Sequence, residues 1–101
     1  MSTLSLETIG GQIKQVCEKH HVTRLRMFGS TVRGEDRPDS DVDLLVDYES
    51  DFSPDFFTMG SLEEDLSPLF NGRRIDLMHA DDVHWFIRNS VLSSARTLYE
   101  R

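Results

Sequence analysis

Apolar residues recur at two different spacings along the chain, and each change of spacing marks a new predicted element. A helical period opens the chain and predicts a helix over residues 5–19. Residues rich in β-forming and long apolar side chains then predict a strand over 22–28, which stops at Gly29-Ser30. Residues 31–33 fit a short helical turn before a polar loop. The first third therefore predicts a helix, a strand and a turn.

The clearest strand is predicted over residues 41–48, where apolar and acidic positions alternate. Residues 49–60 contain Pro54 and are expected to be irregular. Ser61 and Glu64 form the Ser-x-x-Glu pattern of a capping box, which predicts that a helix begins there. The apolar positions that follow at helical spacing are Leu62, Leu66, Leu69 and Phe70.

The last third predicts one more strand and one more helix. Pro68 should disturb the last turn of the preceding helix, and the Asn-Gly pair at 71–72 should end it. Residues 73–78 then predict a third strand. A final helix is expected to start at Asp81 or Asp82. Its apolar stripe would consist of Val83, Ile87, Val91, Ala95 and Leu98.

This succession of elements predicts the fold class α/β (α+β), a small mixed sheet of about three strands flanked by helices. The 101 residues are expected to form a single domain over residues 1–101. No apolar run is long enough to span a bilayer, and no signal pattern opens the chain. The single cysteine, Cys17, cannot form an internal disulfide, which fits a reducing cytoplasm. The net charge of −7 disfavours a nucleic-acid partner.

Three carboxylates stand out by their placement on predicted strands. Asp41 and Asp43 are two residues apart, so both side chains point to the same face. Asp76 lies in the third predicted strand, on the face opposite to its apolar neighbours. If these strands are neighbours in the sheet, the three carboxylates converge on one patch. Because ionised carboxylates repel one another, such a patch needs a cation, and Mg²⁺ prefers carboxylate oxygens. A pair of such ions could clamp the attacking and leaving oxygens of a phosphoryl displacement.

A second candidate site element follows the first strand. Gly29 permits a close approach of the backbone, and Ser30 can offer a hydroxyl and an amide N–H to a phosphate. Arg33, one turn later, can donate to phosphate oxygens. Ser30 could also simply cap the short turn, and Arg33 could instead pair with Glu35 or Asp36.

Together these motifs resemble the DNA polymerase beta-like nucleotidyltransferase superfamily. The pattern is Gly29-Ser30, ten intervening residues, and then Asp41-Val42-Asp43. Three longer runs resemble its minimal nucleotidyltransferase (MNT) subgroup, in which antitoxins of HEPN/MNT toxin–antitoxin pairs occur. These runs are Phe28 to Gly34, Pro38 to Val46, and Arg74 to Leu77.

The resemblance implies a nucleotidyltransferase that uses ATP and Mg²⁺, with two ions. It implies that Asp41 and Asp43 hold the metals and that Asp76 binds metal or deprotonates the acceptor. Gly29 and Ser30 would hold the triphosphate. The implied role is a type VII-like antitoxin that transfers AMP to a tyrosine hydroxyl of a partner HEPN-domain ribonuclease toxin.

Two alternatives of other classes stay open at this point. In one, the chain is a binding module that neutralises its partner by complex formation without catalysis. In the other, the acceptor is a small-molecule hydroxyl, for which a homodimer or other oligomer could complete the pocket. The four histidines show no spacing that suggests a zinc site. The aromatic residues of the second half can belong to the core or can form an exposed apolar patch for a partner.

Overall fold

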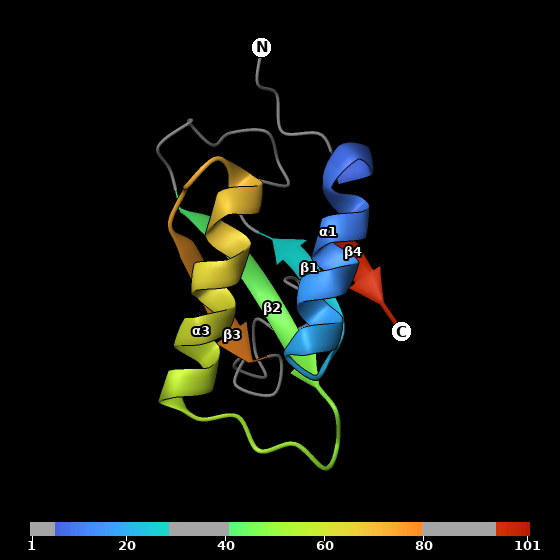
Figure 1. Cartoon of the computed structure of the whole chain (residues 1–101), viewed down its shortest axis with the longest axis vertical. Helices are drawn as coiled ribbons and strands as arrows, with labels where there is room; N and C mark the ends of the chain where they lie inside the picture. Colours follow the sequence, from blue (N-terminus) through green and yellow to red (C-terminus); the bar gives the residue numbers. More distant parts are fainter. Residues whose placement is uncertain (1–5, 29–40, 80–94) are drawn as a thin grey trace.

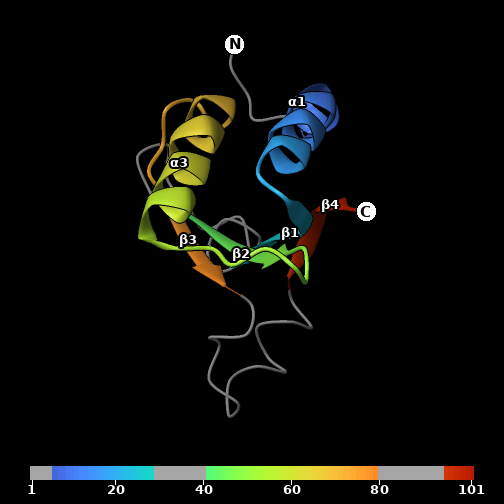
Figure 2. The same ribbon diagram turned by 60° about the horizontal axis from the view of Figure 1, so that its bottom comes forward.

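Two helices cover one face of a four-stranded sheet in the computed structural model of the protein, which describes residues 6–28, 41–79 and 95–101 (Figures 1 and 2). The sheet has the order β3-β2-β1-β4. Strand β1 is antiparallel to both β2 and β4, whereas β2 and β3 are parallel. The described elements are α1 (Leu6–Lys19), β1 (Val22–Phe28), β2 (Val42–Tyr48), α3 (Phe56–Leu66), the 3-10 helix η1 (Ser67–Phe70), β3 (Ile75–His79) and β4 (Arg96–Glu100).

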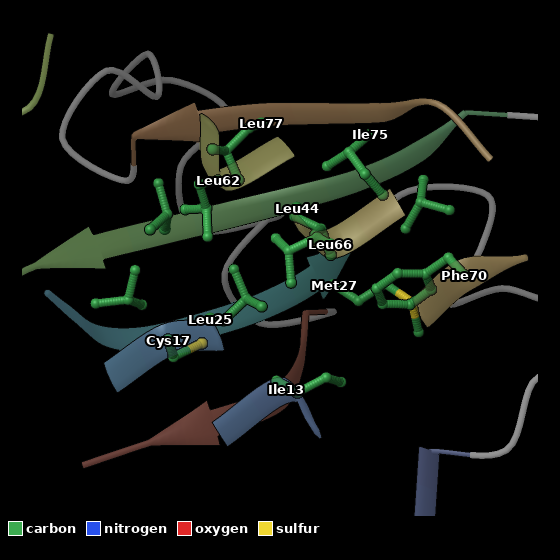
Figure 3. Packing of buried hydrophobic residues seen from close by; sticks show 13 residues of the cluster. Ile13, Cys17, Leu25, Met27, Leu44, Leu62, Leu66, Phe70, Ile75 and Leu77 are labelled. Carbon is green, nitrogen blue, oxygen red and sulfur yellow. The ribbon is translucent and has the colours of Figure 1, made fainter. Parts of the chain in front are cut away.

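The core lies between the helices and the sheet (Figure 3). Every second residue of β2 points into it, because successive side chains of a strand alternate between the two faces. Helix α1 contributes Ile13 and Cys17, and α3 contributes Leu62 and Leu66. The strands supply Val22, Leu25, Met27, Val42, Leu44, Val46, Ile75 and Leu77, and η1 supplies Phe70. The apolar positions that alternate along the strands are therefore the residues that face this core.

The mixed α/β fold class and the early elements are confirmed. The predicted strand over 22–28 coincides with β1, and β2 begins one residue after the predicted start at Asp41. The 3-10 helix η1 begins beside Pro68, and the left-handed backbone of Asn71 and Gly72 (φ of 62° and 77°) ends it as expected. The short turn expected over 31–33 lies outside the described residues.

The final helix was wrongly predicted at its C-terminal end. Residues 96–100, which include Leu98, form β4, so the sheet has four strands rather than about three. Strand β4 pairs with β1, with Leu25 opposite Tyr99. Without this pairing one edge of β1 would present unpaired backbone groups, and such tertiary pairing overrides the helical spacing of Leu98. The rest of the predicted helix, residues 81–94, lies outside the described part of the chain.

The start of α3 was also wrongly predicted. The helix begins at Phe56, and its N-cap is Asp55 rather than Ser61. The Asp55 side chain accepts a hydrogen bond from the Thr58 backbone N–H (2.8 Å), and the Asp55 N–H donates to the Thr58 hydroxyl (2.7 Å). This is a capping box in which threonine replaces the usual Glu or Gln. The irregular segment therefore ends at Asp55, five residues earlier than expected.

Removing this cap has a definite expected cost. Asp55→Ala should lower the free energy of unfolding by about 1 kcal/mol, because the Thr58 N–H loses its acceptor. Urea denaturation measures the change, with Asp51→Ala as a control, because Asp51 is an exposed loop acid outside the cap. Equal stability of the two variants would contradict the capping assignment.

Tyr48, the last residue of β2, has a half-buried side chain with an unusual hydroxyl. Its ring stacks on Phe52 (5.3 Å between centroids) and on His79 (5.9 Å). The hydroxyl oxygen is buried, and it has no hydrogen-bond partner among the described residues. Burial first, and then the nearby charge of Glu63, raises the pKa of Tyr48 to about 12. The folded state therefore favours the neutral phenol.

Tyr48→Phe should make the protein more resistant to alkaline unfolding. A raised pKa in the folded state contributes stability that is present below the unfolded value of 10.0 and is lost as the pH rises through about 12. Phe has no ionisable group, so the variant lacks this loss, which amounts to at most about 3 kcal/mol. Thermal unfolding at pH 7, 10 and 12 tests it. The Cys17 thiol, whose pKa burial also raises to about 12, is common to both proteins and cancels. Parallel pH curves for the two proteins would contradict the assignment.

Within the described ranges, neither helix combines the length and the apolar character that a bilayer crossing requires.

Candidate active site

The sheet face that points away from the helices carries the charged residues of the strands. Because Val42, Leu44 and Val46 face the core, Asp43 and Asp47 point to the opposite face. The same alternation places Arg24 and Arg26 of β1, together with Asp76 of β3, on that face. The polar positions of three neighbouring strands therefore gather on one side of the sheet.

One row of this face brings together two of the predicted carboxylates. Asp43 of β2 and Asp76 of β3 are register partners in the parallel pair. Neighbouring strands lie about 4.8 Å apart, so the two side chains leave the sheet side by side. Phe28, the last residue of β1, pairs with Asp43 from the other side. The row Phe28–Asp43–Asp76 thus crosses three strands and lies where β1 ends.

Asp41 is exposed and lies one residue before β2 begins, on the same face as Asp43 by the strand's period of two. The Val42 N–H donates to the carbonyl of Arg74 (2.8 Å), which ties the start of β2 to the segment that precedes Asp76. Asp41 and Asp43 therefore flank a residue that is tied to the start of β3.

Part of the expected site falls outside the described residues. Gly29, Ser30 and Arg33, predicted to bind the triphosphate, belong to this part, so their role stays a prediction. They follow directly on Phe28, the register partner of Asp43. The chain therefore leaves β1 next to the carboxylate row.

The described carboxylates could supply two ligands to Mg²⁺ but not a complete set of protein ligands. Within residues 6–28, 41–79 and 95–101, no group of three or more His, Cys, Asp or Glu side chains is arranged to hold a metal ion. Mg²⁺ is usually bound by one or two carboxylates together with water and substrate phosphates. Asp43 and Asp76, as register partners on one face, meet that requirement, and exposed Asp41 lies one residue before β2 begins.

An ion-pair cluster on the same face was missed by the sequence analysis. One oxygen of Asp47, Oδ2, accepts from Arg24 Nε (3.2 Å) and from Arg26 Nη2 (3.2 Å). The Arg26 side chain is only 11% exposed, so this pairing offsets the cost of burying its charge. Its Nε is buried and has no hydrogen-bond partner within the described residues. The alternation of Arg24 and Arg26 along a strand was the available signal, because opposite charges across neighbouring strands attract.

The cluster distinguishes Asp47 from the other carboxylates of this face, because Asp47 is paired with two arginines. Asp47 is neutralised by two guanidinium groups, whereas Asp41 and Asp76 are exposed. Among the described residues, Asp41, just before β2, and Asp76 of β3 therefore place exposed negative charge at this end of the face. A divalent cation would be attracted to that end, and it could then bind the phosphates of a nucleotide.

Comparisons with known proteins agree with this geometry. A family model described as polymerase beta, nucleotidyltransferase, matches residues 11–101. The protein adenylyltransferase MntA of Thermococcus cleftensis is 38% identical over 96 residues, which cover 91% of this chain and 94% of the relative. The residues that the family model matches include Asp41, Asp43 and Asp76.

Solved structures with the same fold include a minimal nucleotidyltransferase and a toxin–antitoxin complex. The first matches with a TM-score of 0.70 and 35% identity over 94% of this chain and 97% of that chain. The second is the complex of an MNT antitoxin with a tri-AMPylated HEPN toxin of Shewanella oneidensis, with a TM-score of 0.66 and 14% identity over 96% and 74%. At that identity the second match shows a shared fold alone.

Proposed function

Because the chain belongs to the polymerase beta nucleotidyltransferase family, and within it to the minimal nucleotidyltransferases, we propose that it is an antitoxin that transfers AMP from ATP to a tyrosine hydroxyl of a HEPN-domain ribonuclease toxin. The observation that carries this proposal is the parallel register of Asp43 and Asp76 on the sheet face that points away from the helices. The relative named as a protein adenylyltransferase supports a protein acceptor, and the AMPylated toxin in the Shewanella complex supports a toxin as that protein. Cys17 is a free, buried thiol, which supports a reducing, cytoplasmic setting.

The proposed reaction is a phosphoryl displacement at the α-phosphorus of ATP. The tyrosine oxygen forms a bond to this phosphorus, the bond to the bridging oxygen of the β-phosphate breaks, and pyrophosphate leaves. The tyrosine proton passes to a nearby carboxylate, for which Asp76 is the candidate. Atoms and charge balance without a further reactant, so the chain has to supply positioning and electrostatics.

The residues of the proposed site divide this work. Asp41 and Asp43 would hold Mg²⁺, and Asp76 would complete the set or accept the proton. Mg²⁺, when bound, neutralises charge on the phosphates and polarises the phosphorus–oxygen bond that breaks. Gly29 and Ser30 are proposed to hold the triphosphate, and Arg33 to contact a phosphate oxygen. The Asp47–Arg24–Arg26 cluster keeps β1 and β2 in register beside these groups.

Labelled ATP tests the reaction and its acceptor. The purified protein and the product of the adjacent gene are incubated with Mg²⁺ and ATP labelled on the α-phosphate or, separately, on the γ-phosphate. We expect label on the partner protein from α-labelled ATP only, and mass spectrometry should place one AMP on a tyrosine. EDTA should abolish the transfer. Label from the γ-position would instead indicate a kinase, and label on a small molecule would favour the small-acceptor alternative.

Neutralisation by complex formation alone is the second candidate function. The exposed phenylalanines at the start of α3 favour a partner-binding role of some kind. Co-expression of the toxin with the Asp43→Asn variant separates the two functions. Loss of neutralisation by a variant that still binds the toxin supports catalysis, whereas full neutralisation supports complex formation.

A further inference from the structure

The first turn of α3 presents two adjacent phenylalanine side chains to solvent. Phe56 is 88% exposed and Phe57 is 83% exposed, and their rings meet edge to face with centroids 6.2 Å apart. Phe70, by contrast, is completely buried in the core. Single exposed apolar residues are common, but a contiguous aromatic pair marks an interaction surface. This turn lies at the lower end of α3 in Figure 1.

The pair borders a shallow hollow along one side of the helix. Phe57, Gly60, Ser61 and Glu64 follow at spacings of three and four residues, so they share one side of α3. A Cβ built on Gly60 would meet nothing within 4 Å, so the middle of the hollow is open. Its lining consists of Phe56, Phe57, Gly60, Ser61, Glu63 and Glu64. An apolar side chain of another protein can therefore lie against the rings and the helix backbone.

The charged side chains that line the hollow have one sign. Residues 49–72 contain six acidic residues and no Lys or Arg, so this stretch accounts for most of the chain's net charge of −7. Glu63 and Glu64 line the hollow, and Asp55 caps the same turn. A second copy of the chain would bring like charges together, whereas Lys and Arg would complement them. The expected occupant therefore has an apolar centre and a basic rim.

We propose that the Phe56–Phe57 hollow is the docking surface for the partner protein, which contributes an apolar side chain flanked by Lys and Arg. The identification of this partner as the HEPN-domain toxin rests on the function proposed above. The two rings are the expected hot spots, because aromatic side chains provide most of the energy of such interfaces. The acidic side chains set the orientation and the rate of association.

The docking surface and the carboxylate row lie on different sides of the sheet. Helix α3 packs over β3 on the core side of the sheet (Figure 2). Asp43 and Asp76 point away from the helices, because their neighbours along the strands face the core. Contacts at the hollow therefore bind the partner without touching the reacting groups. Loss of docking should raise the KM for the partner and leave kcat nearly unchanged.

Titration calorimetry with the product of the adjacent gene tests the proposal in an Asp43→Asn background, where no transfer complicates binding. The double variant Phe56→Ala/Phe57→Ala should raise the Kd on the order of 100-fold. The double variant Glu63→Lys/Glu64→Lys should raise the Kd more than the control Glu18→Lys, because Glu18 is an exposed residue of α1 away from the hollow. Thermal midpoints check that the variants remain folded, and the exposure of both phenylalanines makes this the expected result.

Each outcome decides between definite alternatives. A Kd within twofold of the parent for the phenylalanine variant overturns the docking surface, even if AMP transfer is established. Wild-type chain that binds through the phenylalanines but transfers no AMP retains the surface and overturns the proposed function. Sedimentation that shows a homodimer dependent on Phe56 and Phe57 assigns the hollow to a second copy and overturns the basic partner. Equal effects at Glu18 and at Glu63/Glu64 overturn the acidic contribution.

Discussion

Asp43→Asn and Asp41→Asn should each lower AMP transfer on the order of 10³-fold or more. Each change keeps the shape of the side chain but removes the charge with which it would hold Mg²⁺. Stabilisation of phosphates by a positioned cation is a dominant contribution to phosphoryl transfer, so its loss has a large effect on rate. Initial rates with α-labelled ATP measure the effect. Because Asp43 faces Asp76 across the parallel pair, Asp76→Asn should also lower the rate.

The fold should survive these changes, and this separates catalysis from stability. Asp41 is exposed, and loss of a charge beside another carboxylate relieves repulsion in the metal-free protein. Melting curves without Mg²⁺ should therefore be unchanged or shifted upward. Asp51→Asn, the same substitution at an exposed loop acid, is the matched control and should retain full activity. Undiminished transfer by both Asp41→Asn and Asp43→Asn would remove the proposed site.

Phe70→Ala should cost about 3–5 kcal/mol of unfolding free energy, the largest stability effect expected here. The side chain of Phe70, a residue of η1, is fully buried in the core, so its removal leaves a cavity that the neighbours can fill only in part (Figure 3). A domain of this size has a total stability of about 5–15 kcal/mol, so the variant should be close to its unfolding limit. Urea denaturation at 25 °C measures the loss.

The same substitution at Phe57 provides the control, because that side chain is 83% exposed. Phe57→Ala should change stability by no more than about 0.5 kcal/mol. Both variants lose one phenyl group, so the difference between them isolates burial. Equal losses at the two positions would contradict both the core assignment and the exposed aromatic pair.

Local patterns in the sequence predicted those elements whose cause is local. Strand β1 has the predicted bounds because its apolar run ends at glycine, and η1 forms and ends where Pro68 and the Asn-Gly pair direct it. Strand β4 was missed because it depends on pairing with β1, some seventy residues earlier in the chain. The start of α3 was missed because its capping box uses Asp55 and Thr58, and the Ser-x-x-Glu pattern six residues later competed with it.

The candidate site shows the same division. The spacing of Asp41 and Asp43 placed both on one face, but only the pairing of β2 with β3 sets Asp43 opposite Asp76. Parallel pairing joins segments that are far apart in the chain. From the sequence alone, the meeting of the carboxylates could be predicted only if the two strands were assumed to be neighbours. The Asp47 cluster with Arg24 and Arg26 likewise depends on the register between β1 and β2. The sequence motif therefore predicts which residues form the candidate site, and the sheet topology determines which of them lie side by side.

Paramagnetic broadening of amide resonances tests most directly whether the nucleotide site is the Asp43–Asp76 row. Mn²⁺ is titrated with a non-hydrolysable ATP analogue into ¹⁵N-labelled protein and into its Asp43→Asn variant. We expect the amides of residues 42–44 and 75–77 to broaden first, and the variant to lose this effect. Broadening centred on the acidic stretch 49–65, or unchanged by Asp43→Asn, would contradict the assignment of the active site.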